Sequence, residues 1–150
     1  MKPRKVVLVI ISLLCLNLYG RNKYTYQDLS KIQVDFYYNN PSFYPDVGRS
    51  IDDILQGSYE VRKSFFYEDL KEFHPLEKII NTKLEFVNND EKETLANSFV
   101  TCLCVVKIDS KQILLFTYKD SNDDYCIYNR KLIKRNPVFD NFARFLINKL

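Results

Sequence analysis

The chain has 150 residues, a length typical of a single domain. All of its formal charge of +3 lies in residues 1–20, which hold three of the 22 basic residues and none of the 19 acidic ones. The remainder has no net charge, so composition gives no general argument for nucleic-acid binding. The Gly-rich phosphate loops of many nucleotide-binding folds are also excluded, because the chain has only three glycines: Gly20, Gly48 and Gly57.

Residues 1–20 have the pattern of a secretory signal peptide. Three basic residues precede an uncharged run over residues 6–16, and Gly20 offers a small residue at the cleavage position. We expect cleavage to leave residues 21–150 as one α+β domain, secreted or periplasmic.

Two alternatives to cleavage involve a membrane. Residues 1–20 could be retained as an anchor, although the apolar run is shorter than the roughly twenty residues that span a bilayer. Cys15 could be lipidated, but Leu14 stands where a bacterial lipoprotein signal has a small residue. We therefore expect membrane attachment only if residues 1–20 are retained or Cys15 is modified.

The first half of the domain predicts one strand and two helices. Apolar residues alternate over residues 31–38, as in a half-buried strand. Ser50 and Asp53 form a capping box that starts a helix near residues 50–56. A second helix is expected near residues 59–73, where apolar residues recur at helical spacing: Val61, Phe65, Phe66, Leu70 and Phe73.

The second half predicts a sheet followed by a helix. Strands are expected near residues 82–87, 99–109, 112–119 and 125–134, because β-branched and aromatic runs alternate with Asp, Ser and Asn clusters. Asn136 and Pro137 then begin an amphipathic helix near residues 137–150. The sequence thus predicts an α+β fold, an antiparallel sheet of four to five strands packed against helices.

The mature cysteines, Cys102, Cys104 and Cys126, are expected in the core. Neighbours two apart on a strand are about 6.5–7 Å apart, too far for a disulfide. In a simple meander Cys126 lies two strands away from the other pair, which again prevents a bond. The single His74 adds no paired metal-ligand spacing, so we expect neither a zinc site nor a cofactor.

Asp120, Asn122 and Asp124 have the spacing of the first ligands of a calcium loop. The sixth position is Tyr125 instead of glycine and the twelfth is Lys131 instead of glutamate. We interpret the segment as a solvated hairpin loop.

Two groups of residues are candidates for binding. Aromatic residues surround the Pro-containing segment 39–46 and suit a protein or glycan contact, although core packing explains many of them: Tyr37, Tyr38, Phe43 and Tyr44. Tyr128, Arg130 and Lys131 form a basic, tyrosine-bearing strand that could meet an acidic partner or a nucleic acid. The same basic residues could instead protect an edge strand from aggregation, which the neutral charge of the domain favours.

We therefore expect a small exported protein that works by binding: an inhibitor, an immunity-type protein or an envelope accessory. Its partner is expected to be another protein or an envelope component, with no nucleic acid and no metal. One alternative is a secreted hydrolase that uses a carboxylate pair, or His74 with Glu68, Asp69 or Glu72. Another is a structural protein anchored in a membrane by residues 1–20.

Overall fold

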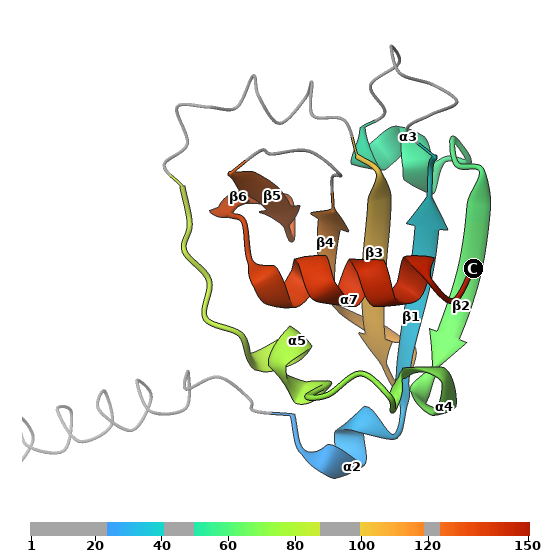
Figure 1. The fold of residues 1–150 in the computed structure, drawn as a ribbon, viewed down its shortest axis with the longest axis vertical. Coiled ribbons are helices and arrows are strands. Elements are labelled where there is room, and N and C mark those ends of the chain that lie inside the picture. Colours follow the sequence, from blue (N-terminus) through green and yellow to red (C-terminus); the bar gives the residue numbers. More distant parts are fainter. Residues whose placement is uncertain (1–23, 41–49, 88–99, 119–123) are drawn as a thin grey trace, which may run out of the picture.

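The computed structural model describes residues 24–40, 50–87, 100–118 and 124–150. They form an α+β fold with a six-stranded antiparallel sheet in the order β2-β1-β3-β4-β5-β6 (Figure 1). The strands are β1 (Ile32–Tyr38), β2 (Val61–Phe66), β3 (Cys102–Ile108), β4 (Lys111–Tyr118), β5 (Tyr125–Tyr128) and β6 (Lys131–Lys134). The helices are α2 (Tyr26–Leu29), α3 (Ile51–Leu55), α4 (Tyr67–Leu70), α5 (Glu77–Asn81) and α7 (Pro137–Ile147). The predicted fold class is confirmed, with more strands than the four to five expected.

One side of the sheet, here called the α7 face, carries the main core. Helix α7 crosses the strands on this side, and α5 lies next to it (Figure 1). The rings of Phe116 on β4 and Phe139 on α7 stack with their centroids 4.5 Å apart, and Phe142 is fully buried beside them. Because α7 begins with an Asn136 cap and Pro137, as predicted, its apolar stripe faces the sheet.

The other side of the sheet, here called the opposite face, is divided into two parts. Near α3 it is apolar, and Ile51 and Ile54 of that helix pack against Leu103, Val105 and Leu115. Toward the start of β1 it is polar. The helices therefore lie on both sides of the sheet, with α3 on the side away from α7.

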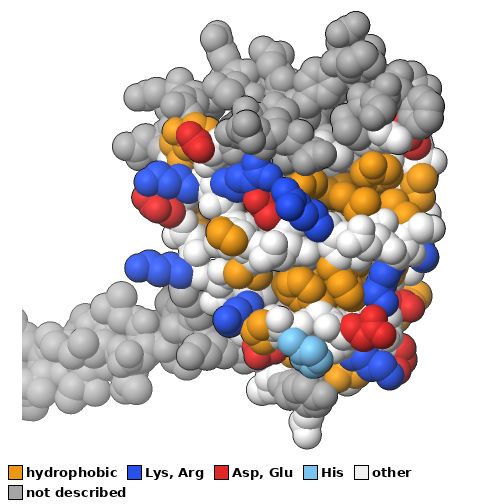
Figure 2. Space-filling model, in the orientation of Figure 1, with side chains coloured by type: hydrophobic (Ala, Val, Ile, Leu, Met, Phe, Trp, Pro, Cys, Tyr) orange, Lys and Arg blue, Asp and Glu red, His pale blue; other side chains and the backbone are white. Residues whose placement is uncertain are grey.

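Surface charges on the α7 face are mixed. Figure 2 shows basic and acidic side chains interspersed over this side, with apolar patches between them. Across the described residues, no helix is both long enough and apolar enough to span a bilayer.

The predicted helix near residues 59–73 is wrong. Val61–Phe66 is strand β2, and only Tyr67–Leu70 is helical. The apolar spacing fits a helix, but β2 instead pairs antiparallel with β1 and places Phe65 opposite Val34 in the core. Tertiary pairing therefore overrides the helical periodicity.

The single strand predicted near residues 125–134 is also wrong, because it folds back on itself. Asn129 and Arg130 have φ values of 46° and 62° and form a two-residue turn between β5 and β6. Asn129 is suited to this left-handed conformation, and its side-chain oxygen accepts a hydrogen bond from the Leu115 backbone N–H at 2.7 Å. Asp109 and Ser110 make the same kind of turn between β3 and β4.

The strand predicted near residues 82–87 is reduced to an edge contact. Phe86 forms an isolated bridge with Ile133 of β6. The Val87 N–H donates to the Leu132 carbonyl at 3.1 Å, and the Lys134 N–H donates to the Glu85 carbonyl at 2.8 Å. Residues 85–87 therefore cover part of the β6 edge without forming a full strand.

The other predicted strands and helices begin and end close to the expected residues. The strands near residues 31–38, 99–109 and 112–119 appear as β1, β3 and β4. The helix near residues 50–56 appears as α3, where Ser50 and Asp53 form the capping box, and Gly57 follows with a φ of 116°.

Candidate functional site

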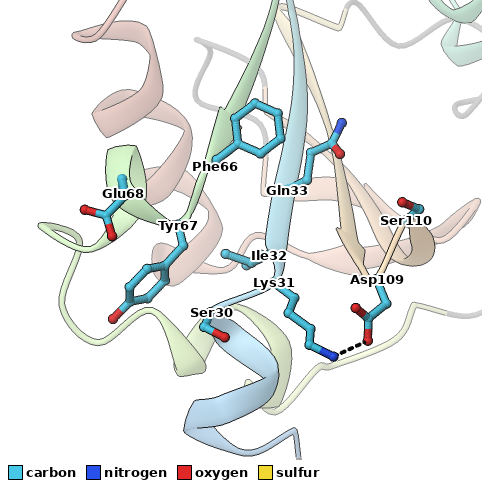
Figure 3. A pocket seen from close by; sticks show the side chains of 9 residues that line it. All are labelled: Ser30, Lys31, Ile32, Gln33, Phe66, Tyr67, Glu68, Asp109 and Ser110. Atoms are coloured by element: carbon cyan, nitrogen blue, oxygen red, sulfur yellow. Dashed lines mark hydrogen bonds and ion pairs between the residues drawn. The ribbon is translucent and has the colours of Figure 1, made fainter.

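A hollow of about 370 Å³ lies where β1 begins and β2 ends, beside the turn between β3 and β4. Figure 3 shows the side chains around it, which come from segments far apart in the sequence. The lining residues are Ser30, Lys31, Ile32, Gln33, Phe66, Tyr67, Glu68, Asp109 and Ser110. The sheet pairing brings these segments together, since Gln33 on β1 is the cross-strand partner of Phe66 on β2.

The rim of the hollow combines an exposed aromatic ring with paired charges. Phe66, at the end of β2, is 54% exposed, so its ring offers apolar surface at the edge of the hollow. Lys31 extends toward Asp109, and their ion pair measures 3.0 Å (Figure 3). Glu68 pairs with Lys71 at 2.5 Å. Both carboxylates in the lining are thus matched by a lysine.

Gln33, one of the lining residues, is held by a buried carboxylate. Asp35 is only 2% exposed and accepts hydrogen bonds from the Gln33 amide at 2.8 Å and the Ser64 hydroxyl at 2.7 Å. Lys107 on β3 forms an ion pair with its other oxygen. These contacts join β2, β1 and β3 and fix the position of Gln33 in the lining.

The hydrogen bonds around Asp35 decide its charge. Burial alone raises the pKa of Asp35, but the hydrogen bonds from Lys107, Ser64 and Gln33 outweigh that effect. Its pKa therefore lies below that of an ordinary carboxyl group, and the side chain is ionised at neutral pH. The ionised Asp35 therefore holds the amide of Gln33, which lines the hollow, in one orientation.

The structure separates the aromatic residues predicted to bind at segment 39–46. Tyr37 lies on the opposite face, where its ring meets Tyr59 edge-on with centroids 5.2 Å apart. Tyr38 lies on the α7 face and stacks on Phe36. Phe43 and Tyr44 lie outside the described residues. Tyr37 and Tyr38 therefore do not share a surface.

The predicted basic group is located at the hairpin between β5 and β6. Tyr128 is partly buried and stacks on Phe139 at 5.6 Å. The exposed Arg130 pairs with Asp52 of α3 at 2.7 Å. The amine of Lys131 lies 5.8 Å from the centre of the Phe86 ring, which is 56% exposed. These residues remain a predicted binding surface, at a strand that is indeed an edge of the sheet.

His74 is not part of the hollow. Its side chain is exposed, and Figure 2 shows the histidine on the surface of the α7 side. Glu68, one of its suggested carboxylate partners, lines the hollow without it.

Cys102, Cys104 and Cys126 are free and buried, as expected. Cys102 and Cys104 belong to the core of the α7 face, and burial raises the pKa of Cys104 well above its ordinary value. Burial raises the pKa of Cys126 to about 11. The thiols therefore behave as small apolar side chains.

The described residues contain no cluster of His, Cys, Asp and Glu able to hold a metal ion. Asp120 and Asn122 of the calcium-like segment lie outside that part of the chain. Asp124 is exposed, and its backbone carbonyl accepts a hydrogen bond from the Arg135 N–H at 2.7 Å.

Sequence reasoning missed the hollow for identifiable reasons. The alternation of β1 placed Gln33 and Asp35 on one face, so their contact could have been found. Phe66 could not, because it was assigned to a helix. The approach of Lys31 to Asp109 depends on the pairing of β1 with β3, which local patterns do not specify.

Comparisons with protein-family models, with curated proteins and with solved structures found no match for this chain.

Proposed function

We propose that this chain is an exported protein that works by binding, and that its partner contacts the hollow between β1, β2 and the β3–β4 turn. The proposal is supported by one observation above all: the 54% exposed Phe66 stands beside a polar hollow in which the lining residue Gln33 is held by the buried Asp35. Export rests on the signal-like pattern of residues 1–20.

The chemistry of the lining indicates the kind of group that is bound. Because the carboxylates of Asp109 and Glu68 are each paired with a lysine, the hollow favours neutral polar groups over free ions. Amide and hydroxyl groups of Gln33, Ser30 and Ser110 offer hydrogen bonds, while Phe66 offers apolar surface. A segment of another protein or of an envelope polymer has this combination. The hydrolase alternative needs either His74 beside a carboxylate or a pair of carboxylates. His74 does not line the hollow, and the two carboxylates that do, Asp109 and Glu68, are each paired with a lysine, so the hydrolase is not proposed.

The test is to fill the hollow and measure capture of the partner. Ser110→Tyr adds a large side chain to the lining, and Lys111→Tyr adds the same side chain at the next residue, which does not line the hollow. Each variant is immobilised and exposed to envelope and secreted material from the native host, and retained components are quantified by mass spectrometry. We expect a component retained by the wild type and by Lys111→Tyr to be lost at least tenfold on Ser110→Tyr.

A third variant separates the hollow from the basic hairpin. Lys131→Glu alters the surface predicted at β6 and leaves the hollow unchanged. Loss of capture on Lys131→Glu with full capture on Ser110→Tyr contradicts the proposal and moves the binding surface to β6.

A further inference from the structure

Strand β2 is an edge of the sheet, and within the described residues no strand pairs with its outer side. An exposed edge presents unpaired backbone N–H and C=O groups that can pair with another strand. The side chains of four β2 residues are exposed. They are the first three residues of the strand, Val61, Arg62 and Lys63, and its last residue, Phe66. Among the residues that the structure describes, this six-residue edge therefore has no strand beside it.

Symmetry limits how two copies of this edge can meet. A two-fold axis perpendicular to the sheet keeps each face on the same side in both copies, so cross-strand partners must point the same way. The axis then lies midway between one residue of β2 and the same residue of the other copy, which are direct cross-strand partners. In β2 that residue is Arg62, Lys63, Ser64 or Phe65.

Side-chain chemistry selects one of these registers. An axis at Arg62 or at Lys63 puts like charges directly opposite each other, which is destabilising. An axis at Phe65 pairs only three residues of β2. An axis at Ser64 pairs residues 62–66 and places Arg62 opposite Phe66 of the other copy.

The Ser64 register also makes favourable contacts on the opposite face. Arg62 already lies on that face, with its guanidinium carbon 5.4 Å from the centre of the Tyr37 ring. Directly opposed side chains in antiparallel strands lie about 4.5–5.5 Å apart at Cβ, so the guanidinium reaches the Phe66 ring of the other copy. The contact occurs twice, once at each of the two Phe66 rings. Ser64 faces its own copy.

We propose that the protein forms a symmetric dimer through β2, in the register centred on Ser64. The two sheets join into one, and Arg62 of each copy stands at the rim of the other copy's hollow, beside Phe66. This dimer goes beyond the proposed binding function and does not depend on it.

The test is sedimentation of the protein, purified from an exporting host, over a range of concentrations. We expect a dimer that dissociates on dilution. Arg62→Ala and Phe66→Ala each remove both symmetric ring contacts and raise the dissociation constant about tenfold. Lys63→Ala, the matched change at the neighbouring basic residue, shifts it less than threefold. Circular dichroism verifies that each variant is folded.

Three outcomes overturn the proposal. The wild type could remain monomeric at the highest concentration reached. Arg62→Ala or Lys63→Ala could tighten the dimer, which indicates that like charges oppose each other in a different register. A dimer unchanged by Arg62→Ala and Phe66→Ala uses another surface. Ser110→Tyr leaves β2 intact, so lost partner capture with normal dimerisation separates this proposal from the binding function.

Discussion

The two sides of the sheet are built on different principles. The α7 face is continuous apolar packing, in which Phe116, Phe139 and Phe142 join the helix to the strands. The opposite face is apolar only near α3 and becomes a hydrogen-bonded network around Asp35 where the hollow begins. Apolar packing is therefore concentrated on one side, and part of the other side is polar.

The largest effect is expected from Phe142→Ala on the α7 face. Phe142 is fully buried, and its removal leaves a cavity beside Phe116, so the free energy of unfolding should fall by about 3–5 kcal/mol. Urea denaturation measures this change. Phe66→Ala is the control, because it removes the same side chain from an exposed position and should change stability by less than about 0.5 kcal/mol. Equal losses for the two variants would contradict the assignment of the core.

A smaller loss, about 2–3 kcal/mol, is expected for Asp35→Ala on the opposite face. The change leaves the partly buried Lys107 without its carboxylate and removes acceptors from Ser64 and Gln33. Asp35→Asn keeps an acceptor oxygen and should lose less in the same denaturation experiment. If Asp35→Ala does not change the free energy of unfolding, the contacts of Asp35 with Gln33, Ser64 and Lys107 do not stabilise the fold.

A still smaller change in the free energy of unfolding is expected from the titration of Asp35. The folded-state pKa of Asp35 is lowered, so the stability it provides is fully present above the ordinary carboxyl pKa of 3.8 and is lost as the pH falls through the folded value. We expect the unfolding free energy of the wild type to decrease more than that of Asp35→Asn when the pH is lowered from 6 toward 3. Parallel pH profiles for the two proteins would refute this role.

The smallest effect is expected for Arg130→Ala, on the exposed ion pair between the β5–β6 hairpin and Asp52 of α3. Exposed pairs contribute little because water and salt screen them. The melting temperature should stay within experimental error at 0.15 M salt. A clear drop would show that α3 depends on this contact in addition to Ile51 and Ile54.

The sequence predicted those parts of the fold that local chemistry determines. The caps at Ser50 and Asn136 and the alternation of β1 set their elements correctly. The errors occurred where strand pairing, and not local sequence, determines the secondary structure. The apolar residues of β2 have helical spacing, but the segment forms a strand because it pairs with β1. The turn at Asn129 and Arg130 lacks glycine, so its signal was weak.

The candidate site was less predictable than the fold. The basic residues Arg130 and Lys131 were correctly associated with a sheet edge, but the hollow was not foreseen. Its lining combines the start of β1, the end of β2 and the Asp109–Ser110 turn, which meet only once the strand order is known. No local pattern in the sequence contains that order.

The short stretch at residues 85–87 affects how far such a sheet can grow. A sheet with two open edges can add a new copy at each side and extend without limit, as in a fibre. Here the backbone of Glu85 and Val87 occupies part of the β6 edge. When two copies join through β2, both outer boundaries of the combined sheet are β6 edges, each partly occupied by residues 85–87 of its own copy. A segment that adds almost no regular structure thus leaves fewer free backbone groups at which a third copy could pair.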